Sequence, residues 1–290
     1  MTPPRPIPAQ DARRVRGART RVPRAAELGR RVEGDDGPWV VLMPGMGMSA
    51  AAWDQVATDL SRDHRVLRYD RPGLGAARAE RSGPPHLHDE VAHLRRVVQE
   101  STGAGARPTG GRPPRPDERV VLVAHSMSWF IAEAFARSDP GAVAGLVSVD
   151  GSVEEQPRAR WGIENDLRLL LAAALRWVPL VGRRLRAALL EDAAYVRMAS
   201  ELLRVRRHLP LPAAPLALVV AARRWVPGTA RWLRRQRHLA ASYRAELARI
   251  SGSAGRAPTV RVVVLRDAGH LVMRDQPARV AAVVRALPPR

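Results

Sequence analysis

Residues 120–128 read Val-Val-Leu-Val-Ala-His-Ser-Met-Ser, and this stretch decides the fold. Its apolar, mostly β-branched first half predicts a buried strand. The residues after 128 have the apolar spacing of a helix, so Ser126 stands at a tight turn between the two elements. A strand, a sharp turn and a helix are the setting of a nucleophile elbow, in which a serine oxygen projects above the edge of a sheet.

Small residues flank this serine. Ala124 and Ser128 stand two positions before and two positions after Ser126, where bulky side chains would clash in so sharp a turn. Glycine is the usual residue at both positions, so the motif alone leaves two interpretations open. One is a nucleophile beside an oxyanion-stabilising N–H on Met127, and the other is an ordinary serine in a strand-to-helix turn.

Other short apolar runs predict further strands, and several of them lead into distinctive loops. The runs cover residues 40–43, 65–69, 145–149, 215–222 and 260–265. Three of the loops are Pro44-Gly45-Met46-Gly47-Met48, Tyr69-Asp70-Arg71-Pro72-Gly73-Leu74-Gly75 and Asp267-Ala268-Gly269-His270.

The order and spacing of these motifs resemble the α/β-hydrolase family, from about Val32 to Leu287. The resemblance implies an α/β fold, namely a mostly parallel sheet flanked by helices, with a helical cap insertion. It also implies a serine hydrolase that cleaves a carboxylic ester or a related small acyl substrate through an acyl-enzyme. The backbone N–H groups of Met46 and Met127 would form the oxyanion hole. Met43, Met46, Met48 and Met127 cluster around this expected site; we interpret Met43 as core packing, and for Met46 and Met127 the hypothesis is an apolar acyl pocket, with core packing as the alternative.

His270 is the expected general base, because imidazole can exchange a proton near neutral pH. It follows a strand and a glycine, which is the family's position for this residue. His125 directly precedes the serine, and we interpret it as structural. The other six histidines we interpret as surface residues: His64, His86, His88, His93, His208 and His238.

The acid of the triad does not stand at the family's commonest position. The strand at residues 215–222 is followed by two arginines and no carboxylate. Some family members carry the acid one strand earlier, where this chain has Asp150, so the resemblance implies a triad of Ser126, Asp150 and His270. Asp267 is the second candidate. Asp150 as a simple turn cap remains the alternative, and with it a non-catalytic or ligand-binding protein with a degenerate triad.

Composition excludes several other classes. The chain has 290 residues and no cysteine, so disulfides, thiolate metal sites and cysteine nucleophiles are absent. No acidic or histidine cluster has metal-ligand spacing, and no glycine motif fits a dinucleotide or phosphate loop, so we expect no metal and no cofactor. The net charge of +20 comes from arginines spread along the whole chain without a nucleic-acid motif, so we expect no specific nucleic-acid partner.

Four segments are expected along the chain. Residues 1–30 form a disordered basic extension, residues 31–153 the first part of the core, residues 154–211 a helical cap, and residues 212–290 the rest of the core. A flexible insertion is expected at 102–118. Residues 1–30 contain no apolar stretch typical of a signal peptide, so we expect a cytoplasmic protein. The cap is expected to be a lid over the site, the alternative being a lid whose basic, leucine-rich face contacts anionic membrane.

Overall fold

The computed structural model describes residues 22–103, 118–153, 169–175, 181–223, 228–251 and 258–287. Seven strands form one sheet in the order β1-β3-β2-β4-β5-β6-β7, and every neighbouring pair is parallel except β1 with β3. The strands are β1 (Arg31–Glu33), β2 (Trp39–Met43), β3 (Arg65–Arg68), β4 (Val120–His125), β5 (Val143–Val149), β6 (Leu216–Ala221) and β7 (Val260–Leu265). The expected fold class is confirmed, and the predicted strands lie at or close to their predicted positions.

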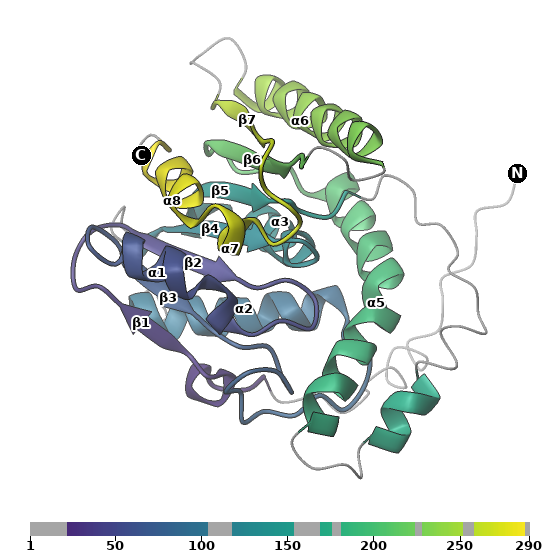
Figure 1. Ribbon diagram of the computed structural model, residues 1–290. Helices are drawn as coiled ribbons and strands as arrows, with labels where there is room; N and C mark the ends of the chain where they lie inside the picture. Colours follow the sequence, from purple (N-terminus) through teal and green to yellow (C-terminus); the bar gives the residue numbers. More distant parts are fainter. Residues whose placement is uncertain are drawn as a thin grey trace, which may run out of the picture.

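Helices cover both faces of the sheet (Figure 1). They are η2 (Ala25–Leu28), η3 (Ala50–Trp53), α1 (Asp54–Leu60), α2 (Leu87–Thr102), α3 (Ser128–Ser138), η5 (Pro140–Ala142), α5 (Val181–His208), α6 (Thr229–Ser251), α7 (Val272–Asp275) and α8 (Pro277–Arg285). Helices α2, α3, α5 and α6 contribute to one apolar cluster, and α1, α7 and α8 contribute to the other. Because both faces are covered, β2, β4 and β6 are almost continuous apolar runs.

The order of the strands places the site. From β2 the chain moves outward to β3 and then returns to form β4 on the other side of β2. Loops that leave the carboxyl ends of β2 and β4 therefore diverge, and this switch point opens a crevice at that edge of the sheet. The loop at residues 44–48 follows β2 and Ser126 follows β4, so the topology brings two distant motifs to one crevice.

The expectation of a disordered extension is wrong for residues 22–30, the part of it that the structure describes. Ala25 and Leu28 are fully buried in η2, and the Ala25 N–H donates to the carboxylate of Glu100 in α2. Two apolar side chains and one satisfied backbone group therefore fix a segment whose Pro- and Arg-rich composition suggested disorder. Residues 1–21, and residues 104–117 of the predicted flexible insertion, lie outside the described residues.

The insertion between β5 and β6 contains the long helix α5, which runs along one side of the molecule in Figure 1. The sequence of the insertion predicts at least two helices, separated by breaks at Pro179 and Gly182, but Gly182 lies in the first turn of α5. Pro179, the other expected break, lies outside the described residues. No helix in the described ranges is both long enough and apolar enough to cross a membrane.

Candidate active site

Ser126 lies in a strained turn between β4 and α3. Its backbone φ is +51°, a left-handed value that costs a non-glycine residue about 1–3 kcal/mol. The turn is held from the neighbouring strand, because the Ser126 N–H donates to the Val149 carbonyl and the Ser126 carbonyl accepts from the Ser152 N–H. Such strain is kept where the surrounding structure fixes the backbone, and it aims the serine side chain at the crevice.

The structure brings His270 and Asp150 to this serine. The His270 Nε2 atom lies 3.1 Å from Ser126 Oγ, and Nδ1 lies 2.6 Å from Asp150 Oδ2. The His270 side chain is 56% exposed, whereas the Asp150 side chain is only 5% exposed, so the carboxylate is shielded and the imidazole faces the crevice. The second candidate acid, Asp267, is exposed and makes no contact with the imidazole within the described residues.

Asp150 is oriented by two donors on its other oxygen. Asp150 Oδ1 accepts hydrogen bonds from the Ala221 N–H at 3.0 Å and from the indole N–H of Trp232 at 2.7 Å. Residue 150 itself has a φ of +44°, so the backbone too is held in an unusual conformation. Sequence reasoning missed the role of Trp232. No local pattern could reveal it, because α6 reaches Asp150 only through the tertiary fold.

His125 supports the loop that carries His270. Its Nε2 lies 2.8 Å from the His270 carbonyl oxygen, so it contacts the backbone of that loop and not the serine oxygen. Burial, assisted by the charge of His270, lowers the pKa of His125 to about 4. Its structural role agrees with the expectation from sequence. The interpretation of the remaining histidines as surface residues is wrong for His64 and His93, which are buried beside acidic residues.

Residues 44–48 lie beside Ser126. A Cβ added to Gly45 would stand 3.2 Å from Ser126 Cβ, so the loop and the elbow are in direct contact. The backbone N–H groups of Met46 and Met127, the expected oxyanion donors, have no protein acceptor within the described residues. The Met127 side chain is fully buried in the core and does not line the crevice, so the expected acyl-pocket role fails for that residue.

The crevice forms a cavity of about 490 Å³ in front of the serine. Ser126, Asp150 and His270 line it together with Met46 from the loop after β2, Tyr195 from α5 and Trp232 from α6. Within the described ranges, no group of three or more acidic or histidine side chains is placed to hold a metal ion. The cavity therefore presents a serine, an imidazole and a shielded carboxylate to a molecule of modest size.

The chain is similar to curated proteins over part of their length. It is 28% identical over 179 residues to the polyketide synthase ThaQ of Burkholderia thailandensis, which covers 56% of this chain and 8% of that protein. It is 28% identical over 132 residues to a pimeloyl-[acyl-carrier protein] methyl ester esterase of Vibrio vulnificus, covering 45% of this chain and 44% of the relative. The chain thus spans less than half the length of either relative.

Solved structures have the same fold. A wild-type Cfl2 structure from Burkholderia cenocepacia superposes with a TM-score of 0.58 at 19% identity, covering 89% of this chain and 92% of the other. The thioesterase domain from the curacin biosynthetic pathway gives 0.57 at 17% identity, covering 89% and 94%. The family model described as "Alpha/beta hydrolase family" matches residues 40–283, which include every strand from β4 to β7 and all three members of the Ser–His–Asp arrangement. This chain therefore belongs to the α/β-hydrolase family.

Proposed function

We propose that this protein is a serine hydrolase that cleaves a carboxylic ester or a related acyl compound through an acyl-enzyme. The observation that carries the proposal is the chain of contacts from Ser126 to His270 to Asp150, at 3.1 Å and 2.6 Å. A serine hydroxyl is a weak nucleophile near neutral pH and needs an adjacent base, which the imidazole supplies. Asp150 then orients the ring and stabilises the imidazolium that forms during attack.

The reaction proceeds in two acyl transfers. Ser126 Oγ attacks the carbonyl carbon while His270 Nε2 takes its proton, and the negative charge that develops on the carbonyl oxygen is met by the N–H groups of Met46 and Met127. His270 next protonates the leaving group. A water molecule then attacks the acyl-enzyme with the imidazole again acting as base, and this step releases the acid and restores the serine.

Esters and thioesters of small acyl groups are the substrates to screen first. Similar proteins are named as a methyl ester esterase and as a thioesterase domain, and both names describe acyl transfer to water. Met46 and Tyr195 line the cavity beside the serine and favour an apolar acyl chain. A series of p-nitrophenyl esters of increasing chain length tests this. Short polar acyl groups that react as fast as longer apolar ones would contradict the apolar pocket.

We further propose that the insertion carrying α5 acts as a lid, since Tyr195 reaches the cavity from that helix. The lid would limit the size of the acyl group. Replacing Tyr195 by alanine should widen the preferred chain length without changing the reactivity of Ser126 toward a small probe. An unchanged chain-length profile would argue against the lid.

A fluorophosphonate probe followed by intact-mass analysis and peptide mapping tests the proposed function without a guess about the substrate. We expect one adduct on Ser126, lost in Ser126→Ala and strongly slowed in His270→Ala, with both variants folded by circular dichroism. A folded wild-type protein that forms no adduct and turns over no ester would favour the alternative, a non-catalytic or ligand-binding member of the family.

A further inference from the structure

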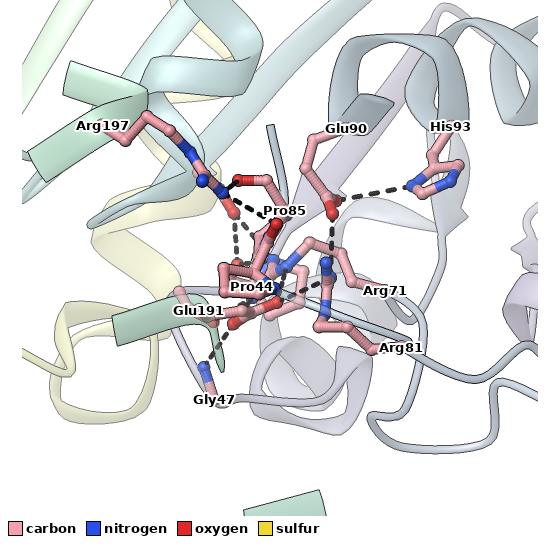
Figure 2. A network of polar contacts seen from close by, with 12 residues as sticks. Pro44, Gly47, Arg71, Arg81, Pro85, Glu90, His93, Glu191 and Arg197 are labelled. Atoms are coloured by element: carbon pink, nitrogen blue, oxygen red, sulfur yellow. Dashed lines mark hydrogen bonds and ion pairs between the residues drawn. The ribbon is translucent and has the colours of Figure 1, made fainter. Parts of the chain in front are cut away.

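A buried ion pair joins helix α5 to the loop beside Ser126 (Figure 2). Arg71, just after β3, is 1% exposed, and Glu191 in α5 is fully buried. Arg71 Nε donates to Glu191 Oε1 at 2.7 Å, and Nη2 donates to Oε2 at 3.0 Å. This side-by-side geometry, with two parallel hydrogen bonds, holds both side chains in one orientation.

Arg71 and Glu191 also form hydrogen bonds with the backbone of residues 44–48, on both sides of Met46. Arg71 donates to the Pro44 carbonyl at 2.6 Å and to the Gly45 carbonyl at 2.7 Å. Glu191 Oε2 accepts the Gly47 N–H at 2.8 Å. Figure 2 shows Glu191 between Gly47 and the guanidinium, so one carboxylate serves both the arginine and the loop.

These contacts fix the direction of one particular N–H group. The Gly45 carbonyl and the Met46 N–H belong to the same peptide unit, which is planar and trans, so the two groups point in opposite directions. With the Gly45 oxygen held toward Arg71, the Met46 N–H faces away from the arginine. The Gly45 carbonyl oxygen also accepts a hydrogen bond from the Met48 N–H at 3.1 Å, and this second contact helps to fix its direction. If the Gly45–Met46 peptide flipped, the Met46 N–H would be lost as a donor, and the Gly45 carbonyl oxygen would take its place.

The charges buried around Arg71 and Glu191 balance one another. Arg81 contacts both Glu191 and Glu90, so two arginines and two glutamates share the interior, with His93 at the edge of the group. Burial alone would lower the pKa of Arg71, but the charge and hydrogen bonds of Glu191 outweigh burial and raise it above its ordinary value. Removing one partner would leave a buried charge without compensation, whereas removing Arg71 and Glu191 together would leave Arg81 paired with Glu90.

We infer that Arg71 and Glu191 are positioning residues that hold the Gly45–Met46 peptide with its N–H available to the oxyanion, so that docking of α5 completes the hole. The inference rests on the proposed function, because it assigns Met46 the role of donor. It makes the insertion part of the catalytic geometry as well as a wall of the cavity. Neither residue touches the reacting atoms, and both act through the backbone of residues 44–48.

A second buried cluster provides a matched control. Glu133 in α3 is fully buried and accepts hydrogen bonds from Arg206 of the same helix α5, at 2.8 and 2.7 Å, and from Arg137 at 2.9 Å. This cluster ties α5 to the core as the first does. Within the described residues, Glu133 makes no contact with residues 44–48. Glu133→Gln therefore removes a buried charge of the same kind, between α3 and α5, while Arg71 and Glu191 still hold residues 44–48 against α5.

The test compares three variants with wild type: Glu191→Gln, Glu133→Gln and the double variant Arg71→Met/Glu191→Met. For each, kcat and KM are measured on one p-nitrophenyl ester, together with the rate of Ser126 labelling by the fluorophosphonate and the Tm. We expect Glu191→Gln to lower kcat and the labelling rate by about 10- to 100-fold, with KM changed by less than about threefold, since a displaced oxyanion donor acts on the transition state. Glu133→Gln should lower Tm and leave kcat near wild type.

The double variant separates positioning from stability. Replacing a buried ion pair by apolar residues removes the uncompensated charge, so its Tm should exceed that of Glu191→Gln. Its kcat should stay low, because no side chain then holds the Gly45 carbonyl. If Glu191→Gln and the double variant both fold and both keep the kcat and labelling rate of the wild type, the positioning role is overturned. The proposed function is not affected by that result. An equal loss of kcat in Glu133→Gln would also overturn the positioning role, because the effect would then be general. A wild-type protein inert to ester and probe would overturn the proposed function and the inference with it.

Discussion

His125 should make the stability of this protein fall steeply in mild acid. The His125 ring is 1% exposed, and its Nε2 atom must carry the proton, since it faces the His270 carbonyl, which can only accept. The opposite nitrogen, Nδ1, is buried without a hydrogen-bond partner in the described structure. A second proton there would create a buried cation that nothing accepts, and this lowers the pKa of His125 from 6.5 to about 4.

Proton linkage gives the direction and the size of this change in the free energy of unfolding. Between pH 6.5 and pH 4 the unfolded chain binds a proton at His125 that the folded chain does not, so the free energy of unfolding rises with pH in that window. Stability is therefore complete above pH 6.5 and is lost as the pH falls toward 4. The pKa difference corresponds to about 3 kcal/mol in total, of which about 2 kcal/mol is lost between pH 7 and pH 5.

Urea unfolding at pH 7, 6 and 5 measures this contribution as a difference between wild type and His125→Gln. The glutamine amide keeps a donor but cannot titrate, so the variant should lose about 2 kcal/mol less than wild type between pH 7 and pH 5. The control is His208→Gln, which makes the same exchange at an exposed histidine. Parallel curves for wild type and His125→Gln would refute the reasoning, because a buried neutral imidazole must contribute such a slope.

Three further outcomes are expected. Asp150→Asn should lower kcat by about four orders of magnitude with little loss of stability, because the imidazole tautomer is no longer enforced; near-normal turnover would exclude Asp150 as the acid. Trp232→Phe should lower the free energy of unfolding by about 1.5–3 kcal/mol and lower kcat at unchanged KM, since the carboxylate loses one of its two donors on Oδ1; a rise in KM alone would point to substrate contact instead. Gly75→Ala should cost more than about 1–2 kcal/mol in denaturant unfolding, because residue 75 has a φ of +50° and a Cβ there would overlap the Asp70 carboxyl; a neutral effect would mean that this turn can rearrange.

Much of the fold was predictable because its signals are local. A strand buried on both faces must be a run of apolar residues, and the runs at 40–43, 145–149 and 215–222 mark β2, β5 and β6. The elbow could be recognised from nine consecutive residues. The extent of the ordered core was less predictable, because burial of Ala25 and Leu28 depends on a partner helix some seventy residues away.

The site was predictable in part. Ser126, Asp150 and His270 each end a strand or follow one, so a parallel sheet brings them to a single edge. Trp232 was not predictable as a partner of Asp150, because nothing in a helical sequence tells which of its residues will face a carboxylate on another element. The burial of His93 was not predictable either. Local composition indicated a surface residue, whereas tertiary contacts bury this side chain.

By itself the sequence determined the alternation of strands and helices and the tight turn at Ser126, because each depends on neighbours within a few residues. Only the tertiary structure decided which of two aspartates meets His270, and which buried charges surround residues 44–48. Arg71 and Glu191 are 120 residues apart in the chain, and their two hydrogen bonds exist only because α5 packs against the crevice. Ion pairs and hydrogen bonds require a match of position and direction that no local pattern encodes.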